Sequence, residues 1–181
     1  MRIQRGDNRA ENIKTSANKT MNTSNTIEIL GDSAIIIPHI YKLAADIQDW
    51  PLILPHYRYM RILERSESRK VADFGASRDG IPVSWSAEQE LFPETNRITF
   101  KHIRGVTKGM WVEWKIEPIS IGAHVSILHQ LDYPVPVLGS LFANHIVGKL
   151  FVENIANKTL RCFKTKVEAE HANGNSGNPG N

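Results

Sequence analysis

The stretch "ITFKHIRGVTKGMWVEWKIEP" (Ile98–Pro118) has the pattern of two β-strands joined by a short turn that is bounded by glycines. Large apolar side chains alternate with polar ones on both sides of this turn, which is the period of a strand with one buried face. His102 is in phase with Ile98 and Phe100, so we expect its side chain to point to the apolar side. The stretch therefore predicts an antiparallel hairpin whose buried face carries a histidine.

Comparable alternating runs on both sides of this hairpin extend it into a sheet. Short turn-forming segments separate them, which favours an antiparallel meander. A further strand is expected at residues 26–34, followed by two short helical segments at 38–50 and 51–57, the first starting at Pro38. The runs of the meander are 58–66, 70–77, 81–92, 97–103, 110–118 and 123–133.

The last element is expected to be one long helix. Residues 138–168 contain no proline, and apolar side chains recur there at steps of three to five residues. The predicted order is then a strand, two short helices, six strands and a long helix. This order predicts an α+β fold in which a curved antiparallel sheet of about seven strands wraps on the C-terminal helix. A ligand would occupy the space that the curvature leaves between them.

The two ends of the chain differ in composition from its middle. Residues 1–24 and 170–181 are polar, so we expect disordered tails around a folded domain at 25–169, with Met21 as an alternative start. The net charge of +3 comes from residues 1–20, and the rest carries 17 basic and 17 acidic residues. This balance argues against nucleic acid as a partner.

The single cysteine, Cys162, cannot form an internal disulfide, which suits a reducing compartment. There is neither a secretory signal nor an apolar run long enough to span a bilayer. We therefore expect a cytoplasmic protein whose basic N-terminal tail makes at most a transient contact with a membrane. The histidines lack metal-ligand spacing, so we expect no metal. The sequence leaves the oligomeric state open.

Four stretches, residues 40–64, 78–85, 109–118 and 147–164, resemble the START-like helix-grip superfamily (SRPBCC, Bet v 1-like). The similarity is greatest to its polyketide cyclase/dehydrase and coenzyme Q-binding branch. The resemblance implies a deep apolar cavity between sheet and long helix, with its mouth at loops 77–82, 104–109 and 132–139. Members bind polyketides, lipids, quinones or plant hormones, and some catalyse cyclisation and dehydration without any cofactor. We expect no cofactor here.

Strand phase and resemblance together nominate site residues. His102 and His129 face inward and, with Tyr57, are candidates for removing a proton beside a carbonyl and stabilising the enolate. They could equally be core residues with satisfied hydrogen bonds, or groups that orient a ligand. By resemblance, Gln89 replaces a cavity arginine of the aromatase/cyclases, which weakens enolate stabilisation. The candidates for binding the ligand are Trp85, Gln89, Phe100, Trp114, Ile127, Tyr133, Leu141 and His145.

Two functions compete at this stage. One is a cofactor-free polyketide cyclase/dehydratase, which the inward histidines favour. The other is a non-catalytic carrier of a lipid or quinone, which Gln89 favours. A third possibility is a protein-interaction module that uses the apolar segment 133–142.

Overall fold

The computed structural model describes residues 18–78, 80–105, 107–134 and 153–176. A seven-stranded antiparallel sheet has the strand order β1-β7-β6-β5-β4-β3-β2, so the six strands after α2 form a continuous meander and β1 closes onto the last of them. The elements are β1 (Asn18–Leu30), α1 (Ser33–Ala45), η1 (Ile47–Asp49), α2 (Trp50–Ile53), β2 (Tyr57–Arg65), β3 (Arg69–Arg78), β4 (Ile81–Phe92), η2 (Pro93–Thr95), β5 (Arg97–Gly105), β6 (Trp111–Ile119), β7 (Gly122–Pro134) and α4 (Glu153–Ser176).

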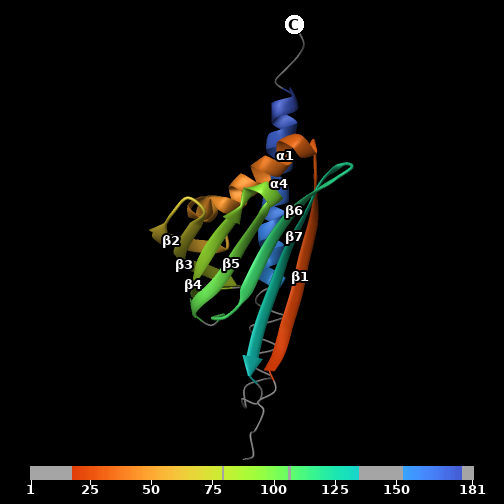
Figure 1. The fold of residues 1–181 in the computed structure, drawn as a ribbon. Helices are drawn as coiled ribbons and strands as arrows, with labels where there is room; N and C mark the ends of the chain where they lie inside the picture. The colour runs from red at the N-terminus through yellow and green to blue at the C-terminus, as the bar shows by residue number, and fades with distance from the viewer. Residues whose placement is uncertain (1–17, 79, 106, 135–152, 177–181) are drawn as a thin grey trace, which may run out of the picture.

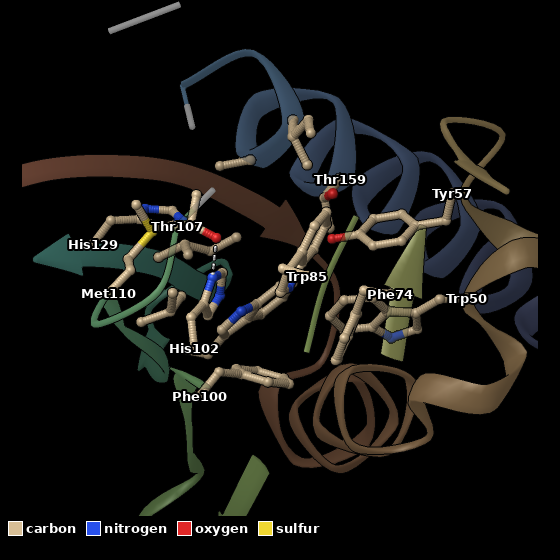
Figure 2. Close-up of a pocket in the computed structure, with 15 residues that line it drawn as sticks. Trp50, Tyr57, Phe74, Trp85, Phe100, His102, Thr107, Met110, His129 and Thr159 are labelled. Atoms are coloured by element: carbon tan, nitrogen blue, oxygen red, sulfur yellow. Dashed lines mark hydrogen bonds between the residues drawn. The ribbon is translucent and has the colours of Figure 1, made fainter. Parts of the chain in front are cut away.

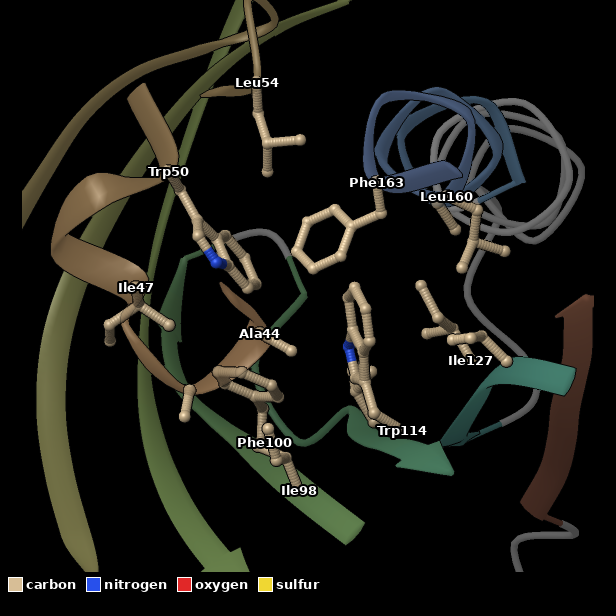
Figure 3. Close-up of a cluster of buried hydrophobic side chains, with 14 of the residues drawn as sticks. Ala44, Ile47, Trp50, Leu54, Ile98, Phe100, Trp114, Ile127, Leu160 and Phe163 are labelled. Atoms are coloured by element: carbon tan, nitrogen blue, oxygen red, sulfur yellow. The ribbon is translucent and has the colours of Figure 1, made fainter. Parts of the chain in front are cut away.

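The sheet curves around α4, and α1 crosses near the C-terminal end of that helix (Figure 1). The core lies between the inner face of the sheet and these helices. Figure 3 shows Trp114 from β6 and Phe163 from α4 meeting in this layer, with ring centroids 5.3 Å apart. The predicted fold, a curved antiparallel sheet on a long C-terminal helix with short helices after the first strand, is confirmed.

The predicted disordered tail, residues 1–24, extends too far into the chain. β1 begins at Asn18 and pairs with β7 over its whole length, from Asn18 opposite Pro134 to Leu30 opposite Gly122. Every second residue of β1 faces inward, as expected for a strand, but two of these inward residues are the polar Thr23 and Asn25. Asn25 is buried against α4, where its side-chain N–H donates to Asn157 Oδ1 at 2.9 Å. Polar side chains at inward positions interrupt the apolar alternation, so the sequence pattern did not predict this part of the strand.

Helix α1 begins before Pro38, where the helix start was predicted. Asp32 caps the helix because its carboxylate accepts a hydrogen bond from the Ala34 amide at 2.9 Å. The chain turns from β1 into α1 at Gly31, which has φ +146°. The predicted strand 26–34 therefore ends at Leu30, and Pro38 lies inside the helix.

Helix α4 extends past the predicted end of the domain at residue 169, through Ser176. Two hydrogen bonds join this helix to β1. Lys164 Nζ donates to the Glu28 carbonyl at 2.8 Å, and the Leu30 amide donates to Glu168 Oε1 at 2.8 Å. The predicted helical residues 138–152 lie outside the described residues. Within the described chain, no helix combines the length and the apolar character needed to cross a membrane.

Candidate functional site

A cavity of about 70 Å³ lies between the inner face of the sheet and the first turns of α4. One wall is a stack of three rings (Figure 2): Trp85 lies parallel to Phe74 at 5.3 Å and 9°, and to His102 at 5.6 Å and 11°. Small-molecule pockets usually enclose about 300–1,000 Å³. Among the described residues the space is smaller, because aromatic side chains fill much of it.

The two inward histidines are each paired with a threonine. His102 Nδ1 lies 2.6 Å from the Thr107 hydroxyl, and His129 Nδ1 lies 3.5 Å from the Thr23 hydroxyl. Burial lowers the pKa of His102 to about 4. Burial, and secondly the proximity of His102, lower the pKa of His129 to about 3. Both imidazoles are therefore neutral at pH 7, and each can donate from one ring nitrogen and accept at the other.

The turn after β5 explains how Thr107 reaches His102. The Gly109 amide donates to the His102 carbonyl at 2.9 Å, which closes the loop and folds Thr107 over the imidazole. Gly105 permits this with φ +90°, and a Cβ at this position would lie 2.5 Å from the Ser84 carbonyl oxygen. The glycines that bound the turn in the sequence thus position a polar group of the cavity.

The Tyr57 phenol is a further polar group of the cavity. Burial raises its pKa, and the Thr159 hydroxyl lowers it in part. The phenol is therefore protonated at neutral pH and can donate a hydrogen bond. Thr159 also lies 2.8 Å from His56 Nε2, measured from its hydroxyl oxygen.

None of the described residues that line the cavity has an ionised side chain at neutral pH. Its polar groups are imidazoles, hydroxyls and a phenol, and the remaining walls are apolar or aromatic. Burying a charged ligand group without a counter-charge is costly. The arrangement suits an uncharged molecule with a few hydrogen-bonding atoms. In the described part of the chain, no three His, Cys, Asp or Glu side chains are placed to share a metal ion.

The inward orientation predicted for the two histidines is confirmed, since both are buried and face the same cavity. Their role, and that of the other nominated residues, stays a prediction. The side chain of Tyr133 and the whole of Leu141 and His145 lie outside the described residues. The nominated residues that line the cavity are Tyr57, Trp85, Phe100, His102, Trp114, Ile127 and His129.

Gln89 faces inward as predicted but is not among the residues that line the cavity. Its side-chain amide donates to the carbonyls of Ala44 at 3.4 Å and Ala45 at 3.2 Å, at the end of α1. Lys70, directly opposite on β3, donates to the same Ala45 carbonyl at 2.7 Å. Gln89 therefore caps a helix end, where terminal carbonyls lack partners. The alternation of apolar and polar residues predicts which face of the sheet a side chain points to. It does not predict whether that side chain lies at the cavity or elsewhere along the strand.

Several cavity residues were not nominated from the sequence. Thr107 and Thr159 give no signal of their own, because threonine is common in both strands and turns. Met110, which precedes β6, also lines the cavity. The indole N–H of Trp50 donates to the Leu43 carbonyl at 3.0 Å, and the Trp50 ring lines the cavity as well.

Comparison with known proteins agrees with this geometry. Residues 37–159 match the sequence model of the family described as polyketide cyclase/dehydrase and lipid transport. The chain belongs to this family. The predicted superfamily is confirmed, while membership of its coenzyme Q-binding branch stays a prediction.

Two curated relatives have different names. The chain is 25% identical over 92 residues to the actinorhodin polyketide synthase bifunctional cyclase/dehydratase of Streptomyces coelicolor, in a match that covers 50% of this chain and only 29% of that protein. It is 28% identical over 122 residues to the ribosome association toxin RatA of Escherichia coli, covering 65% of this chain and 72% of the toxin. Neither name transfers to this chain at such identities.

Solved structures share the fold of this chain. The aromatase/cyclase ZhuI from Streptomyces sp. R1128 superposes with a TM-score of 0.69 at 14% identity, covering 85% of this chain and 96% of that one. A START superfamily protein from Mycobacterium smegmatis has a TM-score of 0.55 at 18% identity, covering 84% and 98%. At these identities the likeness shows the fold alone.

Proposed function

We propose that this protein binds an uncharged, hydrophobic, ring-bearing small molecule in the cavity between the sheet and α4, with carbonyl oxygens as its polar atoms. The observation that carries the proposal is the composition of the cavity, where the parallel rings of Trp85 and Phe74 stand beside hydrogen-bonding groups that are all uncharged. Aromatic side chains around a small cavity favour a ring-bearing ligand, which can pack against their edges. Neutral donors favour a carbonyl over a carboxylate.

Family membership and the polar groups support a cyclase-like chemistry on such a ligand. Cyclisation of a β-keto chain requires a base beside a carbonyl and a donor to the developing enolate oxygen. We assign the base to His102 or His129 and the donor to Tyr57. A base with a pKa near 4 is weak at neutral pH. This chemistry therefore depends on a substrate whose proton is already acidic, as it is between two carbonyls.

The alternative is a carrier that binds the same class of molecule without converting it. The low basicity of both histidines and the absence of a cation from the described cavity lining favour this alternative. The two functions share the site and differ only in turnover.

Mass spectrometry of the organic extract from purified, denatured protein tests the proposal. A neutral ring compound that co-purifies in near-stoichiometric amount supports the carrier. An empty extract favours the cyclase, which releases its product. A screen with short β-keto thioesters then follows, in which His102→Ala and His129→Ala are expected to lose turnover and keep binding. An ionised cargo would contradict the proposal.

A further inference from the structure

Three polar side chains form a row at the cavity. The Tyr57 phenol lines the cavity, and the Thr159 hydroxyl lies beside the phenol oxygen (Figure 2) and lowers the pKa of the phenol. On α4, the same Thr159 hydroxyl oxygen lies 2.8 Å from His56 Nε2. His56 and Tyr57 are each 8% exposed and Thr159 is 2% exposed. Neither His56 nor Thr159 was nominated from the sequence.

The row has two possible directions, because the Thr159 hydroxyl carries a single proton. If His56 Nε2 accepts that proton, the Thr159 oxygen is free to accept from the phenol, and Tyr57 then offers only lone pairs to the cavity. If His56 Nε2 carries a proton and donates it, the Thr159 proton points to the phenol oxygen. The Tyr57 proton is then left for the ligand. The tautomer of His56 thus decides whether the Tyr57 hydroxyl donates a hydrogen bond to the ligand or can only accept one.

The intrinsic chemistry of the imidazole ring favours the second direction. Burial, and secondly the charge of Lys158, lower the pKa of His56 to about 4, so its ring is neutral at pH 7 and carries a single N–H. A neutral imidazole side chain is more stable with that proton on Nε2, from which it donates to Thr159.

We propose that His56 is a positioning residue: Nε2–H donates to Thr159, Thr159 donates to the Tyr57 oxygen, and the Tyr57 hydroxyl donates to a carbonyl oxygen of the ligand. The hydrogen bond from Tyr57 to the ligand rests on the proposed function. The other two hydrogen bonds lie within the protein and need no ligand. A hydrogen bond that merely tied α4 to the start of β2 would require no particular direction.

Long-range ¹H–¹⁵N correlation spectra of the full chain at pH 7 test the direction without any ligand. We expect His56 to carry its proton on Nε2 and to have an unprotonated Nδ1. An Nδ1–H tautomer would overturn the proposal. This measurement needs no substitution, so it does not depend on whether a variant folds.

A matched pair of probes tests the consequence. Acetophenone accepts a hydrogen bond, and α-methylstyrene has the same shape but cannot. We expect the wild type to prefer the ketone roughly three- to tenfold, as one added hydrogen bond implies. Tyr57→Phe should lose the preference. Thr159→Val should weaken it, because the phenol oxygen loses its donor, and Thr159→Ser should keep it. A preference that rises in Thr159→Val would overturn the proposal, because the phenol would then have been donating to Thr159. Failure of the wild type to bind either probe would contradict the proposed function, and the tautomer would still decide the relay.

Discussion

Acidification should destabilise this protein over a pH range in which most proteins are stable, because three neutral histidines are buried, two of them in the cavity. Burial lowers the pKa of His56 and of His102 from 6.5 to about 4, and that of His129 from 6.5 to about 3. Between these values and 6.5, the unfolded chain binds protons that the folded chain excludes. Stability is therefore complete above about pH 6.5 and falls as the pH is lowered.

The size of the effect follows from the three shifts. Each histidine lowers the free energy of unfolding by up to about 1.4 kcal/mol for every pH unit below 6.5. Between pH 7 and pH 5 the three together remove roughly 5–6 kcal/mol, which is a large part of the roughly 5–15 kcal/mol that stabilises a typical domain. Burial is the largest cause of all three shifts, so salt should change the effect little.

Urea denaturation followed by tryptophan fluorescence at pH 5, 6, 7 and 8 measures the effect. We expect the pH dependence to fall by about a third in His129→Gln, because His56 and His102 still contribute. Ile127→Val is the matched control, because it removes one methyl group from the same wall and should cost about 1 kcal/mol equally at every pH. A wild-type stability that is constant from pH 7 to pH 5 would refute the burial of neutral imidazoles.

Three substitutions test the framework around the site by urea denaturation. Asp32→Ala should lower stability by about 1 kcal/mol through loss of the cap of α1; no change would show that the helix starts elsewhere. Gly105→Ala should cost roughly 1–3 kcal/mol from backbone strain and disturb binding, and a neutral effect would contradict the φ of this turn. Gln89→Leu should cost about 1 kcal/mol yet leave probe affinity unchanged; weakened binding would place Gln89 at the ligand.

Much of the fold could be predicted because the chain alternates cleanly where one face of a strand is buried. The strand predicted at 81–92 is β4, Ile81–Phe92, with the same ends. Prediction failed where polar side chains face the core and bond to distant partners. Asn25 is buried against Asn157, 132 residues away in the sequence, and no local pattern reveals such a pairing.

The sequence predicts which side chains face inward, but not which of them reach the cavity or how large the cavity is. His102 and Gln89 both lie on inward phases, yet one faces the cavity and the other caps α1. The volume depends on how Trp85 stacks on Phe74, which is decided by packing across three strands and not by either residue alone. Thr159 reaches the site only because α4 crosses the sheet at that point.

An NMR titration of the full chain with acetophenone and, separately, with benzoate, a planar carboxylate of similar size, tests whether the cavity binds an uncharged ring compound. We expect acetophenone to shift the signals of Trp85, His102 and Thr107 in a saturable manner, and benzoate to leave them unchanged. Equal binding of the anion, or a ketone that perturbs only residues outside the cavity, would contradict the proposed function.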